Sequence, residues 1–275
     1  MALVDCIPVH LRPSLLLLTG VYHFLMTIFE TIFVHPDLSL LFNLSALREK
    51  SFGRLWINNG EAMSEKMPDS MDALLKTAHG VVLDVGPGSG EQLPRFYPDK
   101  IDIMYGAEPS IYLHPGLLKN ADKAGFGSKY RALQCGGEPE SLIPALAKVG
   151  ALNVGASQGA FDAIVCVRVL CGVPRPEETI QGLYRLLKPG GRLLVCEHTV
   201  NPWRHGSGSI LARIFQVIYK LLGWSFFMGG CNIDRDTVKF LRAGAGTEGW
   251  AKTELKYVEP DTAVPHIVGY LVKRT

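Results

Sequence analysis

The pattern of apolar residues divides this chain into a long hydrophobic segment near the N-terminus and a body in which short apolar runs alternate with helical stretches. Residues 15–34 read LLLLTGVYHFLMTIFETIFV and are apolar on all sides, unlike a surface helix with one apolar stripe. Twenty such residues are about enough to cross a bilayer core as a helix. Pro36 ends the predicted helix, and a second apolar stretch at residues 38–47 could lie flat on the same surface.

Two polar side chains interrupt the hydrophobic segment, His23 in the middle and Glu30 near its end. A carboxylate in lipid is costly, although one near a helix end can reach the interface. Three interpretations stay open: a membrane anchor or interfacial helix, a helix packed over the body as a substrate lid, and a cleaved signal. We expect residues 1–50 to form the anchor or lid and residues 51–275 to form the main domain.

From about residue 80, short β-branched runs alternate with helical stretches. The predicted strands are residues 81–85, 101–105, 130–134, 161–169 and 192–196. The helix candidates between them are residues 91–96, 139–148 and 177–187. This alternation predicts an α/β fold with a parallel sheet covered by helices on both faces.

The order of elements changes after residue 205. An apolar helical run spans residues 210–222, and another helix is expected from about residue 234. Residues 254–259 and 266–273 are spaced like an antiparallel hairpin.

Composition narrows the possible partners. Hydrophobic residues make up 47% and charged residues 20%, which is typical of a globular chain. The formal net charge of +2 offers no field able to hold nucleic acid, so we expect no nucleic-acid partner. Six cysteines are scattered without a CxxC pair, which favours buried reduced thiols over a disulfide framework. They are Cys6, Cys135, Cys166, Cys171, Cys196 and Cys231.

The most informative motif is LDVGPGSG, which follows the first predicted strand. Gly86 permits a sharp turn, Gly88 lets the backbone approach a ligand, and Gly90 lets a helix start against the strand. The spacing is GxGxG rather than the GxGxxG of dinucleotide binders or the GxxxxGK[ST] of a P-loop, so phosphate binding is disfavoured.

Candidate ligand-binding residues follow the next three strands. Glu108 ends the second strand, where a carboxylate can accept both ribose hydroxyls of a nucleoside, although a solvated loop glutamate is the alternative. Gly137 and Glu138 follow the third strand, where an adenine edge would lie. Arg168 follows the fourth, a place for residues that flank a ligand.

Taken together, LDVGPGSG, Glu108, FDAIVCVRVL and RLLKPGGRLLV resemble the class I S-adenosylmethionine-dependent methyltransferases, over residues 80–198. The resemblance implies a Rossmann-like seven-stranded sheet with an antiparallel last strand, and S-adenosyl-L-methionine as cofactor. The segments CVRVLCGV, GCNIDRDT and VPHIVGYLVK also resemble the methyltransferase-like 7 family. Those are thiol methyltransferases with an N-terminal hydrophobic membrane segment.

The resemblance implies roles for particular residues. The residues predicted to bind S-adenosylmethionine, the methyl donor, are Asp84, Gly86, Gly88, Gly90, Glu108, Gly137, Glu138 and Arg168. The glycines would cradle the methionine half of the donor, Asp84 would help hold its amino group, and Glu108 would clamp the ribose. Arg168 is in addition a candidate for orienting the acceptor, and an ion pair with a nearby acid is the alternative for this residue.

The acceptor side is less defined by the sequence. A thiol needs little help from a base, whereas a hydroxyl would want one, and His198 at the end of the fifth strand is then the catalytic candidate. A histidine that bonds a loop carbonyl is the alternative. We expect no metal, because a sulfonium donor is already activated. The expected apolar walls are Phe52, Trp56 and residues 210–227, and the resemblance adds Cys231 with Asn232.

The leading hypothesis is methyl transfer to a small lipophilic acceptor, a thiol first, by a membrane-associated enzyme on the cytosolic face, for example of the endoplasmic reticulum. A cytoplasmic enzyme is the alternative location. An O- or N-methyltransferase of a specialised metabolite is the second hypothesis. A catalytically idle, nucleoside-binding membrane protein is a third. A nicotinamide-dependent oxidoreductase is disfavoured, because it needs a third glycine one residue later.

Overall fold

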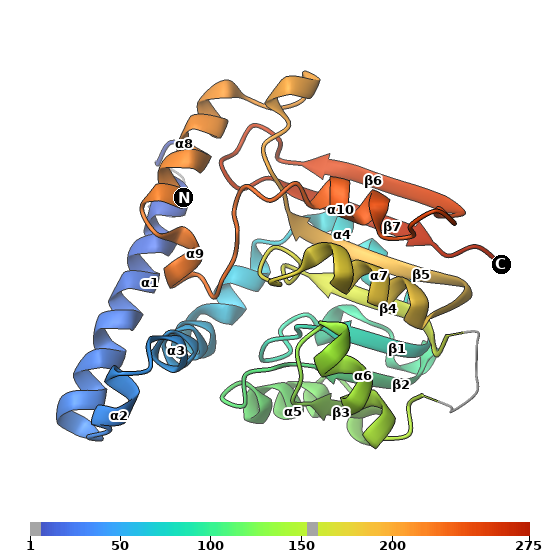
Figure 1. Cartoon of the computed structure of the whole chain (residues 1–275), viewed down its shortest axis with the longest axis horizontal. Coiled ribbons are helices and arrows are strands. Elements are labelled where there is room, and N and C mark those ends of the chain that lie inside the picture. Colours follow the sequence, from blue (N-terminus) through green and yellow to red (C-terminus); the bar gives the residue numbers. More distant parts are fainter. Residues whose placement is uncertain (1–6, 153–158) are drawn as a thin grey trace.

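A seven-stranded sheet forms the centre of the computed structural model, which describes residues 7–152 and 159–275 (Figure 1). Its strand order is β3-β2-β1-β4-β5-β7-β6. The strands are β1 (Gly80–Val85), β2 (Ile101–Ala107), β3 (Tyr130–Leu133), β4 (Phe161–Val167), β5 (Leu187–His198), β6 (Lys252–Val258) and β7 (His266–Val272). The first five pair in parallel, while β7 is antiparallel to β5 and β6. The predicted fold, with its antiparallel last strand, is confirmed.

Helices cover both faces of this sheet because its strands are apolar on both faces. One hydrophobic core contains Leu83 and the inner faces of α6 (Pro139–Lys148), α7 (Pro176–Leu186) and α10 (Thr237–Ala243). The neighbouring Val82 points to a second core with α4 (Asp69–Leu75) and α5 (His114–Lys123). Alternate residues of β1 thus enter opposite cores, as the pleat of a strand requires.

The helix expected at residues 91–96, with Gly90 at its start, was predicted wrongly. The structure has only a 3₁₀ turn, η3 (Leu93–Arg95), followed by a second one, η4 (Pro98–Lys100). Tyr97, the residue before Pro98, is extended with φ −100° and ψ 101°, as the residue before a proline usually is, so the turn cannot continue as a helix. The glycine loop is therefore followed by turns rather than by a helix. Two further 3₁₀ turns are η5 (Gly127–Lys129) and η6 (Trp203–His205).

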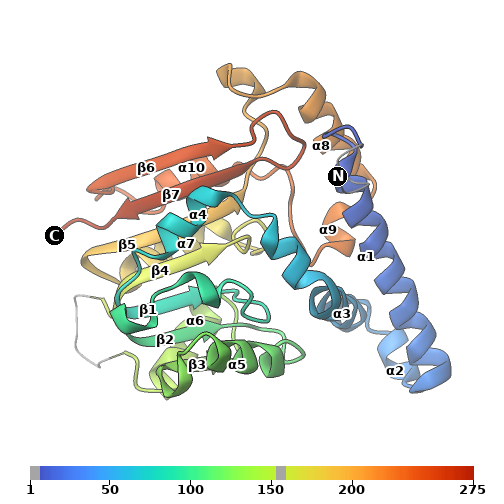
Figure 2. The same cartoon turned by 180° about the vertical axis from the view of Figure 1, so that it is seen from behind.

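A layer of helices stands across the end of the sheet at which the parallel strands finish (Figures 1 and 2). It consists of α1 (Arg12–Phe29), the π-helical turn η2 (Glu30–Val34), α2 (Leu38–Leu41), α3 (Leu44–Glu65), α8 (Ile210–Leu221) and α9 (Trp224–Phe227). Leu17 of α1, Leu55 of α3 and Trp224 of α9 meet in a third core. The layer therefore joins residues near 20 to residues near 220.

The polar residues of the N-terminal hydrophobic segment face the protein. The amide Nδ2 of Asn59 lies 2.9 Å from Nε2 of His23, and Glu30 forms an ion pair with Arg54. Both partners belong to α3. Residues 12–34 form one helix long and apolar enough to cross a membrane, the only such helix in the described parts of the chain. The two groups that would be costly in lipid are thus paired inside the protein.

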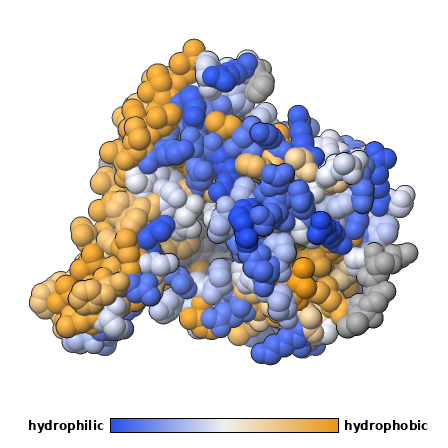
Figure 3. All heavy atoms as spheres, in the orientation of Figure 1, coloured by the Kyte–Doolittle hydropathy of each residue, from blue (hydrophilic) through white to orange (hydrophobic). Residues whose placement is uncertain are grey.

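The opposite face of the layer is apolar and exposed. Figure 3 shows this face, which we call the apolar edge, as a continuous orange band over α1, α2 and α8. Its members are Leu15, Leu18, Tyr22, Leu25, Phe29, Phe33, Val34, Leu38, Phe42, Leu44, Ile210, Leu211, Ile214, Val217, Ile218, Leu221 and Leu222. A patch of this extent on a soluble monomer marks a surface that meets something apolar.

Candidate functional site

The main pocket lies between the carboxyl ends of the strands and α3, with a volume of about 610 Å³. All eight residues expected to bind the methyl donor line it, although they come from the end of β1 and from the loops after β1, β2, β3 and β4. They are Asp84, Gly86, Gly88, Gly90, Glu108, Gly137, Glu138 and Arg168. Parallel strands all finish at this edge, which is where such sheets bind their ligands.

The glycine loop is a backbone arrangement that side chains would not tolerate. Gly86, Gly88 and Gly90 have φ angles of 65°, 62° and 83°, in the left-handed region. A Cβ on Gly88 would lie 2.5 Å from Nε1 of Trp56, and one on Gly86 would lie 2.5 Å from Cγ2 of Val169. The loop is therefore held against α3 on one side and the segment after β4 on the other, so both glycines are required by close approach.

Glu108 fastens the glycine loop from the end of β2. Its Oε2 accepts a hydrogen bond from the backbone N–H of Gly88 at 3.0 Å, and its Oε1 accepts one from Ser110 at 2.9 Å. Nε2 of His114 donates to the carbonyl oxygen of Glu108 at 2.8 Å. Each carboxylate oxygen has two lone pairs, so one on each oxygen is left for a ligand hydroxyl.

Two buried carboxyl groups stand in this part of the pocket. Burial raises the pKa of Asp84 to about 7, with a further increase from the charge of Glu108. Burial likewise raises the pKa of Glu108 to about 7, against the lowering effect of its bonds from Ser110 and Gly88. Both groups thus keep a large protonated fraction near neutral pH and would ionise more fully beside a cation.

The loop after β3 completes the donor side. A Cβ on Gly137 would lie 2.8 Å from Cγ1 of Val85, so the backbone passes close to the end of β1. Glu138 is half-buried and directly precedes α6, and the backbone N–H of Gly136 donates to the hydroxyl of Ser141 at 3.0 Å. These contacts hold Gly137 and Glu138 in the pocket wall.

Arg168 combines a strained backbone with unused hydrogen-bond donors. Its φ of 55° is uncommon for a residue other than glycine. Nη1 donates to the carbonyl of Met63 at 3.3 Å, and the guanidinium carbon lies 5.3 Å from the centre of the Trp56 ring. Within the described residues, its buried Nε and Nη2 have no hydrogen-bond partner. A strained, buried cation with free N–H groups is a candidate for binding a ligand anion.

Aromatic and apolar side chains form the other wall. Phe52 and Trp56 of α3 line it as predicted, together with Met228 and Gly229 after α9. The prediction that residues 210–227 would also form this wall was wrong, because α8 turns its apolar side chains outward. Amphipathicity identifies an apolar face but does not say which surface that face will meet.

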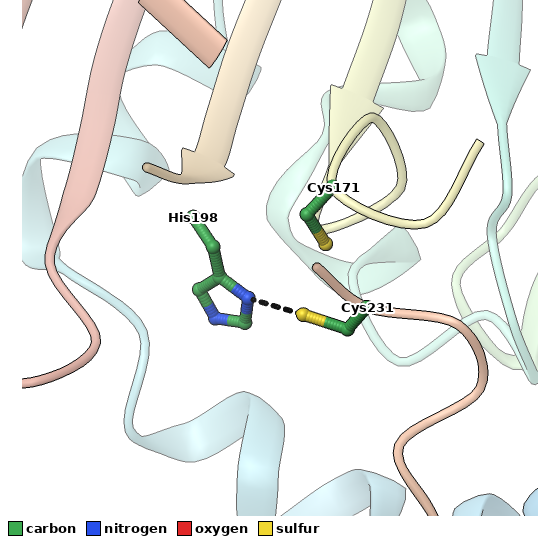
Figure 4. A group of neighbouring side chains, drawn as sticks. All are labelled: Cys171, His198 and Cys231. Atoms are coloured by element: carbon green, nitrogen blue, oxygen red, sulfur yellow. Dashed lines mark hydrogen bonds between the residues drawn. The ribbon is translucent and has the colours of Figure 1, made fainter. Parts of the chain in front are cut away.

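A cluster of Cys171, His198 and Cys231 lies beside the apolar wall (Figure 4). Both cysteines line the pocket, whereas His198 does not and lies 3.3 Å from the Cys231 sulfur through Nδ1. The neighbouring Cys171 thiol and the proximity of His198 hold the pKa of Cys231 well below its usual range. The same neighbouring pair of thiols raises the pKa of Cys171. From the sequence, Cys171 was expected only as one of the buried reduced thiols, and nothing connected the three residues.

Glu197 precedes His198 in the chain and is a functional candidate to which the sequence assigned no role of its own. Its fully buried carboxylate accepts hydrogen bonds from the backbone N–H groups of Val169 and Leu170, both at 2.9 Å. It thereby fixes the loop that carries Arg168 and Cys171. The available signal was an acid at the end of the apolar strand RLLVCEH, where a buried charge needs strong partners.

His266 and Asn232 lie outside the main pocket. His266 opens β7, as expected, with its ring centroid 4.8 Å from that of His198. Asn232 lies on a smaller neighbouring pocket rather than on the main one. Five cysteines are buried and free, in agreement with the prediction of reduced thiols, while Cys6 lies outside the described residues.

Comparisons with known proteins agree with this architecture. Residues 60–233 match a family model described as a methyltransferase domain. Thiol S-methyltransferase TMT1B of Rattus norvegicus is 32% identical over 42% of the chain and 46% of its own length. Thiol S-methyltransferase TMT1A of Homo sapiens is 27% identical over 70% of both chains. The chain thus spans about half the length of the first of these relatives.

Two further comparisons widen the range of chemistry. A ubiquinone biosynthesis O-methyltransferase of Xanthomonas oryzae is 34% identical over 46% of both chains. The solved structure of geranyl diphosphate methyltransferase with GPP and sinefungin superposes with a TM-score of 0.52 at 15% identity, covering 77% of this chain and 78% of that one. At that identity the superposition concerns the fold alone.

The pocket also fits S-adenosylmethionine on its own geometry. The glycine cradle excludes side chains, Glu108 keeps lone pairs free for ligand hydroxyls, and the two carboxyl groups suit a cationic ligand. The family model covers more than half of the chain, from the end of α3 through the five parallel strands to the segment after α9. On this match and this architecture, the chain belongs to the methyltransferase domain family.

Proposed function

We propose that this chain transfers the methyl group of S-adenosylmethionine to the sulfur of a small lipophilic thiol. The observation that carries the proposal is one pocket with two unlike walls. Glycine amides and carboxylates form the first wall, and Phe52, Trp56 and Met228 with two thiols form the second. The donor brings a methyl group that is already activated on a sulfonium. The protein therefore has to align two molecules and exclude water.

On the donor side, we assign the glycine loop to the methionine half of the donor and Asp84 to its ammonium group. Glu108 accepts from the ribose hydroxyls with the lone pairs that the Gly88 and Ser110 amides leave free. Gly137 and Glu138 line the adenine. The unpaired N–H groups of Arg168 are available to the carboxylate of the methionine half.

The choice of a thiol as acceptor rests on the lack of a histidine base on the apolar wall of the pocket, since the buried carboxyl groups Asp84 and Glu108 belong to the wall assigned to the methyl donor. No histidine is among the pocket-lining residues in the described parts of the chain, and His198 lies behind Cys231. A thiol of ordinary pKa is a few per cent ionised near neutrality, whereas an alcohol is not ionised. The TMT1A likeness over 70% of the chain supports the same choice.

An O-methyltransferase is the second candidate, favoured by the likeness to the Xanthomonas enzyme. In that case His198 would have to receive the acceptor proton, and Cys231 lies between it and the pocket. Among possible oxygen acceptors, an acidic phenol would depend least on this proton transfer to His198. A catalytically idle nucleoside-binding membrane protein is the alternative of another class, and the intact donor wall weighs against it.

We further propose that the enzyme lies on the cytosolic face of a membrane with its apolar edge in the interface. The exposed side chains of α1 recur at Leu18, Tyr22, Leu25 and Phe29, a stripe along one side of the helix. The opposite side packs on α3 and pairs His23 and Glu30 there. A helix occupied by protein along one side and apolar along the other suits a position in the membrane plane.

This orientation also gives the first fifty residues a role. They would form much of the lipid-facing layer, and residues 51–275 would form the methyltransferase domain, with α3 continuing through the boundary. A lipophilic acceptor would reach the pocket along α3, whose Phe52 and Trp56 belong to the apolar wall.

The deciding experiment uses the full chain in detergent with methyl-labelled donor and a matched panel of alkyl thiols, phenols and amines of equal chain length. We expect label on the thiols, increasing with chain length, and none on the amines. Label on phenols with none on thiols would replace this proposal by the second candidate. A chain that binds S-adenosylhomocysteine but labels no acceptor would support the idle protein.

A further inference from the structure

We propose that Cys171, His198 and Cys231 bind a zinc ion, and that the fourth position on this ion takes the sulfur of the acceptor thiol. The site comes from three separate segments: the loop after β4, the end of β5 and the loop after α9. Figure 4 shows the three side chains pointing toward one another from these segments. The second half of the proposal rests on the proposed function, whereas the metal site does not.

The spacing of the three side chains suits a tetrahedral ion. Their ligand atoms all lie within 4.8 Å of one another, with 3.3 Å between Nδ1 of His198 and the sulfur of Cys231. Zinc bonds of about 2.3 Å to sulfur and about 2.0 Å to nitrogen would place tetrahedral ligand atoms about 3.5–3.8 Å apart. Small side-chain movements therefore suffice. Two thiolates and one imidazole are ligands that zinc prefers over magnesium or calcium.

The backbone around the cluster is firmly held. Glu197 accepts from the backbone N–H of Cys171 at 3.4 Å, and the N–H of Asn232 donates to the Cys171 carbonyl at 2.8 Å. The hydroxyl of Thr237 donates to the carbonyl of His198 at 2.7 Å. Arg235 ties the two cysteine loops together by donating to the carbonyls of Leu170 and Val173. Outer contacts of this kind orient the ligands of a metal site.

The location of the cluster indicates a catalytic rather than a structural ion. Structural zinc sites have four protein ligands, whereas catalytic sites have three and leave one position open. Only three ligands converge here in the described residues, and the two cysteines form part of the pocket wall. The open position can therefore be reached from the pocket in which the acceptor would lie.

The ion would give the acceptor its reactive form. The thiol binds zinc and releases its proton to solvent, because a coordinated thiol is deprotonated. A sulfur lone pair then forms the bond to the methyl carbon while the bond from that carbon to the donor sulfur breaks. The electron pair of the broken bond stays on the donor sulfur, which becomes neutral. The thioether product is a weak ligand and leaves the ion.

The first test is metal content, which does not depend on turnover. The full chain in detergent, purified under reducing conditions with zinc supplied, should contain about one zinc per chain by elemental mass spectrometry. Cys231→Ser, Cys171→Ser and His198→Asn should each lose it, with affinity for S-adenosylhomocysteine reporting that the variants are folded. Cys166→Ala is the matched control, because this buried cysteine lies outside the cluster. A metal-free parent chain, or a Cys171–Cys231 disulfide under these conditions, overturns the site.

The second test asks whether the acceptor occupies the fourth position. Cobalt in place of zinc should show thiolate-to-cobalt absorption and the intense bands of a tetrahedral ion. Hexanethiol should shift these bands, while hexanol should not. Bands that hexanethiol leaves unchanged overturn the acceptor role, even if cobalt is bound.

A third measurement separates this inference from the proposed function. If the metal acts on the thiol, Cys231→Ser should lower thiol methylation by about 100-fold and leave the affinity for S-adenosylhomocysteine unchanged. If the metal-free chain methylates thiols at the full rate, the zinc site is overturned, whereas the proposed function, methyl transfer to a thiol, stands. A zinc-loaded chain whose bands respond to hexanethiol, but which labels only phenols, contradicts the proposed function instead.

Discussion

The donor wall and the helical layer of this molecule are built by different means. The donor wall comes from short motifs at strand ends, such as the loop from Gly86 to Gly90 and its partner Glu108. The helical layer brings α1 and α3 against α8 and α9, about 200 residues away along the chain. Local turn chemistry defines the first region, and only long-range packing defines the second. Substitutions should therefore affect donor binding and membrane binding separately.

The largest effect should come from placing charges on the apolar edge. In Ile214→Asp with Ile218→Asp on α8, two exposed apolar side chains lose their contact with lipid, which costs at least about 3 kcal/mol, or on the order of 100-fold in membrane partitioning. Flotation with phosphatidylcholine vesicles measures it. Donor affinity should stay unchanged, because neither residue lines the pocket.

The matched control for this change is Leu118→Asp, which places the same charge on an exposed apolar residue of α5 away from the edge. Full membrane retention of the α8 variant would mean that α1 alone anchors the chain. The in-plane orientation would then be wrong.

The next largest effect should come from Glu108→Ala on the donor wall. Hydrogen bonds to a charged group are worth about 1.5–3 kcal/mol, so we expect the affinity for S-adenosylhomocysteine to fall about 10- to 150-fold. Calorimetry measures this, and vesicle binding should not change. Glu61→Ala, an exposed acid on α3, is the control. Equal affinity of Glu108→Ala and the parent chain would remove the ribose assignment.

A smaller effect is expected where the two regions touch. Trp56 of α3 lies against Gly88, donates to Oε2 of Glu91 at 3.0 Å and stacks near Arg168. In Trp56→Ala the loss of these contacts should weaken S-adenosylhomocysteine binding by about 1 kcal/mol, or about fivefold. Ile57→Ala, exposed on the same helix, should bind like the parent. If Trp56→Ala bound S-adenosylhomocysteine as tightly as the parent chain, the donor wall and the helical layer would be fully independent.

The smallest effect is a proton released when the donor binds. Burial raises the pKa of Asp84 and Glu108 to about 7, and a bound ammonium and ribose hydroxyls would favour their ionised forms and lower both values. Binding near pH 7 should therefore release up to about half a proton per carboxyl group, or about one proton in all, and affinity should fall as the pH drops below 7. Calorimetry in buffers of different ionisation enthalpy measures the release. Proton uptake on binding would contradict the assigned roles.

Sequence patterns predicted the sheet well because its strands are short, apolar and separated by turns. They missed α3, where only two large apolar residues, Leu47 and Leu55, are buried and the other buried positions are small: Ser51, Gly53, Gly60 and Ser64. They also predicted a helix after the glycine loop, where the extended Tyr97 before Pro98 leaves only a 3₁₀ turn. Hydrophobic periodicity identifies elements that bury large side chains and overlooks those that bury small ones.

The sequence by itself determined the α/β order of elements, the strained glycine turn and the carboxylate at the end of β2, because each depends on neighbouring residues. Only the tertiary structure decided that His23 and Glu30 face α3, that α8 turns outward, and that Cys171, His198 and Cys231 meet. These contacts join residues between 24 and 60 positions apart, and no local preference encodes which surface such a segment will meet. Packing of the whole chain selects that surface.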